Sequence, residues 1–202
     1  ELLSSIGVCG IIIESFSDKH LKPSTRNSLT ATGLPVVFIE RTGDCYGFNR
    51  VLVDNFLGTY SATAYLLQHG HTHLLYITKM KKSEVERSRT NGFKKALEET
   101  ANNEICYHIG YCQDFSPESA FNVTMEAFSQ DPLITGIVAW NDTYAAGALL
   151  YAYSQKKNVP EDITIIGHDD VLAPNIVPPL SSVHMPIEEI ASSAVQIVSN
   201  YY

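Results

Sequence analysis

Short apolar runs alternate with amphipathic stretches along the whole chain. Six of the runs are rich in β-branched or aromatic residues and almost continuously apolar, which is typical of strands covered on both faces of a sheet. They lie at 10–14, 36–40, 74–78, 105–110, 136–140 and 163–167. The alternation of such strands with helical segments predicts a doubly wound α/β architecture with parallel sheets.

Helical spacing is found in five segments between and after these runs, at 55–70, 88–100, 116–130, 142–158 and 187–202. The first is expected to start near Asn55 and to end at Gly70 in a left-handed conformation. The third begins with Ser116 as N-cap and Pro117 at the first helical position. The side chains expected to face inward from the third and last segments are Phe121, Met125 and Phe128, and Ile190, Ala194, Val198 and Tyr201.

Polar residues follow four of the predicted strands, at 40–41, 79–82, 141–142 and 168–170. In open parallel sheets the ligand binds beyond the carboxyl ends of the strands. Carboxylates, an amide and basic groups can form paired hydrogen bonds with vicinal hydroxyls, so a sugar or polyol is the expected ligand. In "GHDD" (167–170) we expect one carboxylate to bind the ligand and the other to cap the following segment, in preference to a metal or acid–base site.

Composition narrows the classes of function. The chain has 202 residues, 45% of them hydrophobic, and a net charge of −8, which makes it a poor partner for nucleic-acid phosphates. Its four cysteines include no CxxC pair, which suits a reducing cytoplasm. No apolar stretch approaches the roughly 18 residues of a membrane span. The opening "ELLSSIGVCG" has neither Met nor a leader pattern, so a fragment of a longer protein is expected.

Chemical motifs are few. No GxGxxG, GxxxxGK[ST] or GxSxG sequence occurs, so we predict no cofactor and no catalytic residue. The triplet "HGHTH" (69–73) has the spacing of metal ligands on a strand. His69, however, is expected to be the last helical residue and His71 to begin the turn into the next strand. We therefore predict a helix end with His69 and His73 as incidental surface residues, and no metal site.

Six segments together resemble the effector-binding core of the LacI/GalR family of bacterial transcription regulators. They are "VLVDN" (51–55), "YLLQHGHTHLLYI" (65–77), "RTNGFKKAL" (89–97), "NDTYAAGALLYA" (141–152), "VPEDITIIGHDD" (159–170) and "PPLSSV" (178–183). Each is weak alone, but the six stand in the family's order. The resemblance implies a type I periplasmic-binding-protein-like fold of two doubly wound parallel-sheet lobes, and a domain that is not an enzyme.

The resemblance also implies ligand-binding residues. Arg89 matches the arginine that clamps the effector, and Asn141 and Asp169 match effector contacts at strand ends. Glu40 stands where members often carry Asp, and Phe115 where an aromatic commonly stacks on a sugar. From the residues alone, Arg89 could instead pair with Glu86 on its own helix, and Phe115 could belong to the core.

Departures from the family pattern concern single residues and the extent of the chain. His168 replaces the usual Phe or Tyr, and Cys9 stands where Asp is usual. We expect residues 56–185 to form the C-terminal lobe. Residues 1–53 and 187–202 would form an incomplete N-terminal lobe. A helix-turn-helix DNA-binding domain is absent from this sequence.

The sequence therefore predicts the sugar-sensing domain of a cytoplasmic transcription regulator. The ligand would bind in the cleft between the lobes. The expected partners are a sugar or sugar-like effector, a second copy of the chain in a homodimer, and DNA only through a domain missing from this chain. No membrane partner is expected. The alternatives are an exported sugar-binding protein of a transport system and, more remotely, a metal-dependent hydrolase.

Overall fold

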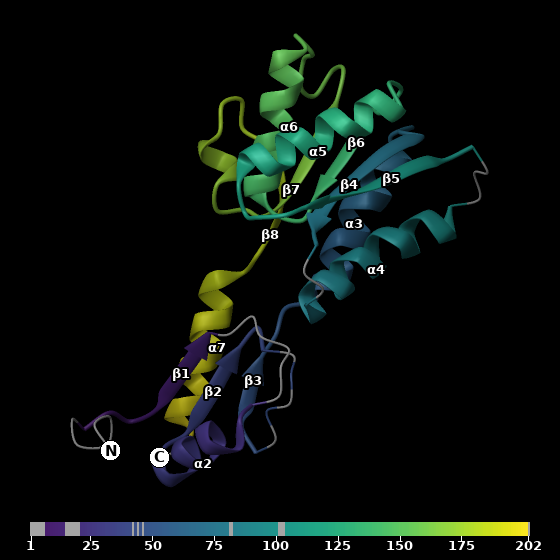
Figure 1. Ribbon diagram of the computed structural model, residues 1–202. Helices are drawn as coiled ribbons and strands as arrows, with labels where there is room; N and C mark the ends of the chain where they lie inside the picture. Colours follow the sequence, from purple (N-terminus) through teal and green to yellow (C-terminus); the bar gives the residue numbers. More distant parts are fainter. Residues whose placement is uncertain are drawn as a thin grey trace. The chain divides into compact units, whose positions relative to one another are not determined.

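The chain folds into two compact units (Figure 1). The structure is a computed structural model, which describes residues 7–14, 21–41, 43, 45, 47–80, 83–100 and 104–201. The N-terminal lobe comprises Glu1–Val53, Ser83–Val85 and Pro186–Tyr202, and the C-terminal lobe comprises Asp54–Lys82 and Glu86–Met185. No helix in the described ranges is long and apolar enough to cross a membrane.

The C-terminal lobe is built on a five-stranded parallel sheet in the order β5-β4-β6-β7-β8. Its strands are β4 (His73–Lys79), β5 (Cys106–Cys112), β6 (Gly136–Ala139), β7 (Thr164–Asp169) and β8 (Ser181–His184). Its helices are α3 (Asn55–Gln68), α4 (Glu84–Glu99), α5 (Pro117–Gln130), α6 (Asp142–Ser154) and the short 3-10 helix η1 (Ala173–Asn175).

Helices cover both faces of this sheet. On one face α3 and α4 pack their apolar side chains, such as Leu66 and Phe93, against Tyr76 of β4 and Val138 of β6. On the other face lie α5 and α6, which pack against each other (Figure 1). Because the inner strands β4, β6 and β7 are covered twice, their central residues are almost all buried. This is the doubly wound arrangement predicted from the sequence.

The N-terminal lobe has a smaller parallel sheet in the order β1-β2-β3, formed by Ile11–Glu14, Val36–Ile39 and Asn49–Val51. Helix α2 (Pro23–Ala31) packs on one face, where Leu29 meets the cluster of Val36 and Phe38. Helix α7 (Ile187–Ser199) packs on the other, with Ala194 and Val198 against Val37. The three strands agree with the expectation of an incomplete lobe.

Some local predictions were wrong. Met125 is 49% exposed and Tyr201 is 65% exposed, whereas both were expected to face inward. The inward stripe of α5 runs instead through small residues such as Ala120 and Ala127, which allow close contact with α6. Tyr201 lies beyond the end of α7 at Ser199, so it does not continue the helical face.

Candidate functional site

Arg89 lies at the centre of a polar cluster at the carboxyl end of the C-terminal sheet. Its side chain, carried by α4, is 3% exposed. Its Nε donates to Asn55 Oδ1 at 2.8 Å, one terminal nitrogen donates to the Trp140 carbonyl oxygen, and the other donates to Asp169 Oδ1 at 3.2 Å. The guanidinium fork therefore joins the start of α3 to the ends of β6 and β7. These three hydrogen bonds fix the Arg89 side chain at the carboxyl ends of the strands.

Asp169 ends β7 in a backbone conformation that is unusual for a residue with a side chain, with φ of +98°. Its Oδ1 also lies 3.1 Å from His168 Nδ1. Burial lowers the pKa of His168, so the ring is neutral at pH 7 and Nδ1–H donates to the carboxylate. The side chain of Asp169 is 30% exposed, and its Oδ2 accepts no hydrogen bond from the described residues. One oxygen is therefore anchored, and the other is available to a ligand.

Asn141 is the N-cap of α6. Its Oδ1 accepts a hydrogen bond from the Tyr144 backbone N–H at 3.0 Å, which fixes the side chain. Its amide NH2 makes no hydrogen bond to the residues that the structure describes, and the residue is partly exposed. Asn141 therefore offers donors at the end of the strand next to β7.

An aromatic group borders these polar residues. Phe115 is 60% exposed, so the alternative that it belongs to the core is wrong. Its ring centroid lies 5.7 Å from that of Trp140 and 6.1 Å from that of Tyr144. The Lys79 ammonium lies 4.1 Å from the Trp140 ring centroid and 5.3 Å from that of Phe115. Phe115 thus presents a ring beside the Arg89 cluster, although sequence reasoning missed Lys79 and Trp140 as its neighbours.

Glu40 lies in the N-terminal lobe, directly after β2. The residue is 4% exposed and has φ of +53°. Its Oε1 accepts the Val53 backbone N–H at 2.7 Å, a contact within its own lobe that joins the end of β2 to the segment after β3. The structure gives Glu40 this bracing role, and its effector contact stays a prediction.

Asp142 holds the loop after β7, a role that was not predicted from the sequence. It is 2% exposed, and its Oδ2 accepts the backbone N–H groups of Val171, Leu172 and Ala173 at 2.9, 3.0 and 3.1 Å. Its Oδ1 accepts from Ser182 Oγ at 2.6 Å. Asp142 therefore caps the segment after "GHDD". The prediction that one of the motif's own carboxylates would be this cap was wrong.

Asp170 has a different role from the predicted cap. Its Oδ2 lies 2.9 Å from His184 Nδ1, and its backbone N–H donates to Ser182 Oγ at 3.0 Å. Both contacts connect Asp170 to β8, and its backbone has φ of +56°. The neighbouring carboxylates of "GHDD" thus serve separate partners.

The histidines of "HGHTH" make three unrelated contacts. The Nδ1 atoms of His69, His71 and His73 lie 2.8 Å from Tyr65 O, 2.9 Å from Thr135 Oγ1 and 2.7 Å from Asp131 Oδ2. Gly70 has φ of +86°, which confirms the predicted left-handed helix end. His73 is not an incidental surface residue, because it pairs with Asp131. In the described part of the chain, no group of three or more His, Cys, Asp or Glu side chains is arranged to hold a metal ion.

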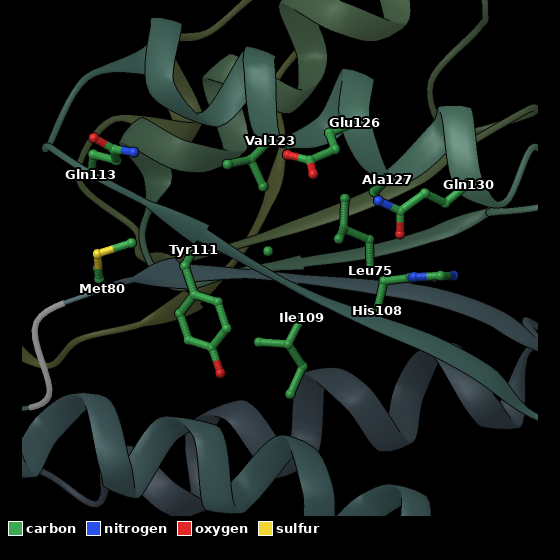
Figure 2. Close-up of a pocket in the computed structure, with 11 residues that line it drawn as sticks. Leu75, Met80, His108, Ile109, Tyr111, Gln113, Val123, Glu126, Ala127 and Gln130 are labelled. Carbon is green, nitrogen blue, oxygen red and sulfur yellow. The ribbon is translucent and has the colours of Figure 1, made fainter.

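A separate cavity of about 350 Å³ lies between β5 and α5. Figure 2 shows Val123 and Glu126 of α5 on one side of it, whereas the side chains of Ile109 and Tyr111 of the edge strand β5 point away from α5, to the opposite face of the sheet. None of the five predicted ligand-binding residues lines this cavity. The polar cluster around Arg89 and the cavity are therefore distinct features of the same lobe.

Comparison with known proteins identifies the domain family of the chain. Residues 63–200 match the family model described as "Periplasmic binding protein-like domain". The chain is 30% identical to the HTH-type transcriptional repressor PurR of Actinobacillus pleuropneumoniae over 86% of its own length and 53% of that protein. It is also 30% identical to the HTH-type transcriptional regulator DegA of Bacillus subtilis, over 92% and 55%. The chain thus spans about half the length of these curated relatives.

Solved structures similar to this chain include a LacI family regulator. The crystal structure of a LacI family transcriptional regulator from Enterococcus faecium, with bound ribose, is 27% identical and has a TM-score of 0.79. That alignment covers 98% of this chain and 73% of the other. All three named relatives are transcription regulators rather than enzymes.

Proposed function

The chain belongs to the periplasmic binding protein-like domain family, in the effector-binding form of LacI-family regulators, and we propose that its effector is a sugar or sugar-like molecule. The observation that carries this proposal is the carboxylate of Asp169, anchored through Oδ1 and open at Oδ2. Such an acceptor, held by a buried arginine, suits a ligand hydroxyl that must donate a hydrogen bond.

Three described side chains together suit a carbohydrate. The Asp169 Oδ2 atom accepts from one hydroxyl, and the Asn141 amide donates to a neighbouring oxygen. The exposed ring of Phe115 covers the C–H face of the sugar, where polar groups would be out of place. Ribose is the first sugar to test, because the related regulator from Enterococcus faecium was crystallised with it.

The proposal also covers how the effector is sensed. We extend the proposal to an effector held between the two lobes, with Glu40 as the contact from the N-terminal lobe. A ligand that contacts both lobes favours the arrangement in which both contacts form at once. DNA would be bound by a domain outside this chain, since the net charge of −8 opposes phosphate binding by these residues. We propose that the protein is located in the cytoplasm and is not an exported sugar-binding protein of a transport system.

A homodimer is part of the same proposal. Leu150 and Tyr153 of α6 are 53% and 45% exposed, and Val177 in the loop after η1 is 82% exposed. The Tyr153 hydroxyl donates to the Val177 carbonyl oxygen at 2.9 Å, and Leu150 lies one helical turn before Tyr153, so the three exposed residues are neighbours. An apolar surface of this kind suits a second copy of the chain.

The test of effector binding is calorimetric titration with pentoses, hexoses and sugar acids. In an Asp169→Asn variant we expect affinity to fall at least tenfold, on the order of a lost charge-assisted hydrogen bond. Asp170→Asn is the matched control, because asparagine tolerates the positive φ at both positions and Asp170 faces His184. Equal affinity of the two variants for the bound sugar would refute the assignment of Asp169.

A further inference from the structure

Trp140 carries an unexplained polar atom beside the proposed effector site. It directly follows β6 and is 9% exposed. Its indole Nε1 is buried and has no hydrogen-bond partner among the described residues. A buried donor without a partner is unfavourable and rare in folded proteins, so it calls for an explanation.

The surroundings of the indole place it within the site. Its own carbonyl oxygen accepts from Arg89, whose guanidinium carbon lies 4.7 Å from the Trp140 ring centroid. Phe115, the proposed sugar platform, lies 5.7 Å from it between ring centroids. The next residue in the chain is Asn141. Trp140 is therefore held between the residue that anchors Asp169 and the residue that covers the sugar.

We propose that Trp140 is a specificity-determining residue whose Nε1–H donates to an oxygen of the bound effector. An indole N–H is a donor only, so it selects an acceptor such as a sugar ring oxygen or hydroxyl oxygen, and it disfavours a deoxy analogue at that position. This inference rests on the proposed sugar-binding function and adds a named donor to it. The gain on binding is the larger because the donor is unsatisfied without ligand.

Access to Nε1 requires some movement, and the neighbours differ in their freedom to move. Arg89 is buried and held by three hydrogen bonds. Phe115 is 60% exposed, and no hydrogen bond can hold its side chain in place. Rotation of the Phe115 ring about its side-chain torsions is therefore the movement that the proposal requires, and it leaves the Arg89 cluster undisturbed.

Trp140 is the only tryptophan of the 202 residues, so one NMR signal reports on the proposed contact. In a spectrum of the 15N-labelled chain, the single indole N–H peak is followed while ribose, or whichever sugar the calorimetric panel identifies, is added to saturation. We expect the indole proton to move downfield and its exchange with solvent to slow. A peak that stays in place with unchanged exchange at saturation would overturn the inference.

A Trp140→Phe variant supplies the second test, because it keeps a ring but removes the N–H. We expect affinity for the same sugar to fall about tenfold, the upper range for one neutral hydrogen bond, in protein whose melting temperature shows that it is folded. The analogue lacking the accepting oxygen should bind both proteins equally. If Trp140→Phe binds as wild type while Asp169→Asn does not, this inference fails and the proposed function stands. If wild type binds no sugar of the panel, both fail.

Discussion

Replacing the Asp142 carboxylate by an amide should destabilise the C-terminal lobe strongly. Three backbone N–H groups, those of Val171, Leu172 and Ala173, converge on Oδ2 of a side chain that is 2% exposed. Hydrogen bonds to a charged group contribute about 1.5–3 kcal/mol each and neutral ones about 0.5–1.5 kcal/mol. An Asp142→Asn variant therefore loses about 1 kcal/mol at each of three bonds, or about 3 kcal/mol in the free energy of unfolding.

The remaining contact of Asp142 adds to this loss. In the variant the amide NH2 would replace the oxygen that accepts from Ser182 Oγ, so the serine hydroxyl proton would lose its acceptor. A loss of about 3 kcal/mol is a large part of the 5–15 kcal/mol that stabilises a typical domain. The same substitution should weaken sugar binding, because the loop held by Asp142 follows Asp169 directly.

The assay is urea denaturation followed by the fluorescence of Trp140, which lies in the C-terminal lobe and is the only tryptophan. Glu126→Gln is the matched control, since Glu126 is an exposed carboxylate on α5, and it should change the free energy of unfolding by less than about 0.5 kcal/mol. If Asp142→Asn cost less than about 1 kcal/mol, the carboxylate would not be holding the loop as the hydrogen bonds indicate.

Two further predictions concern the same lobe. Burial lowers the pKa of His168 below its unfolded value of about 6.5. The unfolded chain therefore binds a proton at this histidine before the folded chain does, and the free energy of unfolding decreases as the pH falls from about 6.5 toward the lowered pKa. Wild type should therefore lose more stability than His168→Phe between pH 7 and pH 5 in urea titrations, and parallel losses would contradict this assignment. A Cβ on Gly92 of α4 would lie 2.3 Å from the Phe56 carbonyl oxygen, so Gly92→Ala should cost about 1–3 kcal/mol in thermal unfolding. Asn91→Ala, exposed on the same helix, serves as control, and equal melting temperatures of the two variants would refute the close approach of α3 and α4.

The architecture could be predicted because periodicity reports burial. Strands such as 74–78 and 136–140 are continuously apolar since they lie inside a doubly covered sheet. The edge strands predicted at 10–14 and 105–110 were also confirmed, but they are not covered on both faces as expected: β1 alternates between partly buried and exposed residues, and β5 is mostly exposed or partly buried. Helix α2, with no buried residue, and the short strands β3 and β8 carry too little apolar pattern to be found in this way.

The site could be predicted only in part. Family spacing singled out Arg89 and Asp169, which the structure joins at 3.2 Å, and Phe115, which it exposes. The contacts of Asp142 could not be predicted, because its partners are backbone N–H groups about 30 residues away that carry no side-chain signature. The histidine triplet could be interpreted from its position along the chain, since regular spacing means a shared face only when all three residues lie on one strand. The helix end at Gly70 was confirmed, whereas the pairing of His73 with Asp131 could not be foreseen.

The most direct test of the central claim is a crystal structure of the chain with the sugar that binds most tightly in the calorimetric panel. We predict that the sugar contacts Asp169 Oδ2 and the Asn141 amide, with its C–H face on Phe115. A sugar bound elsewhere, for instance in the cavity between β5 and α5 (Figure 2), would contradict it.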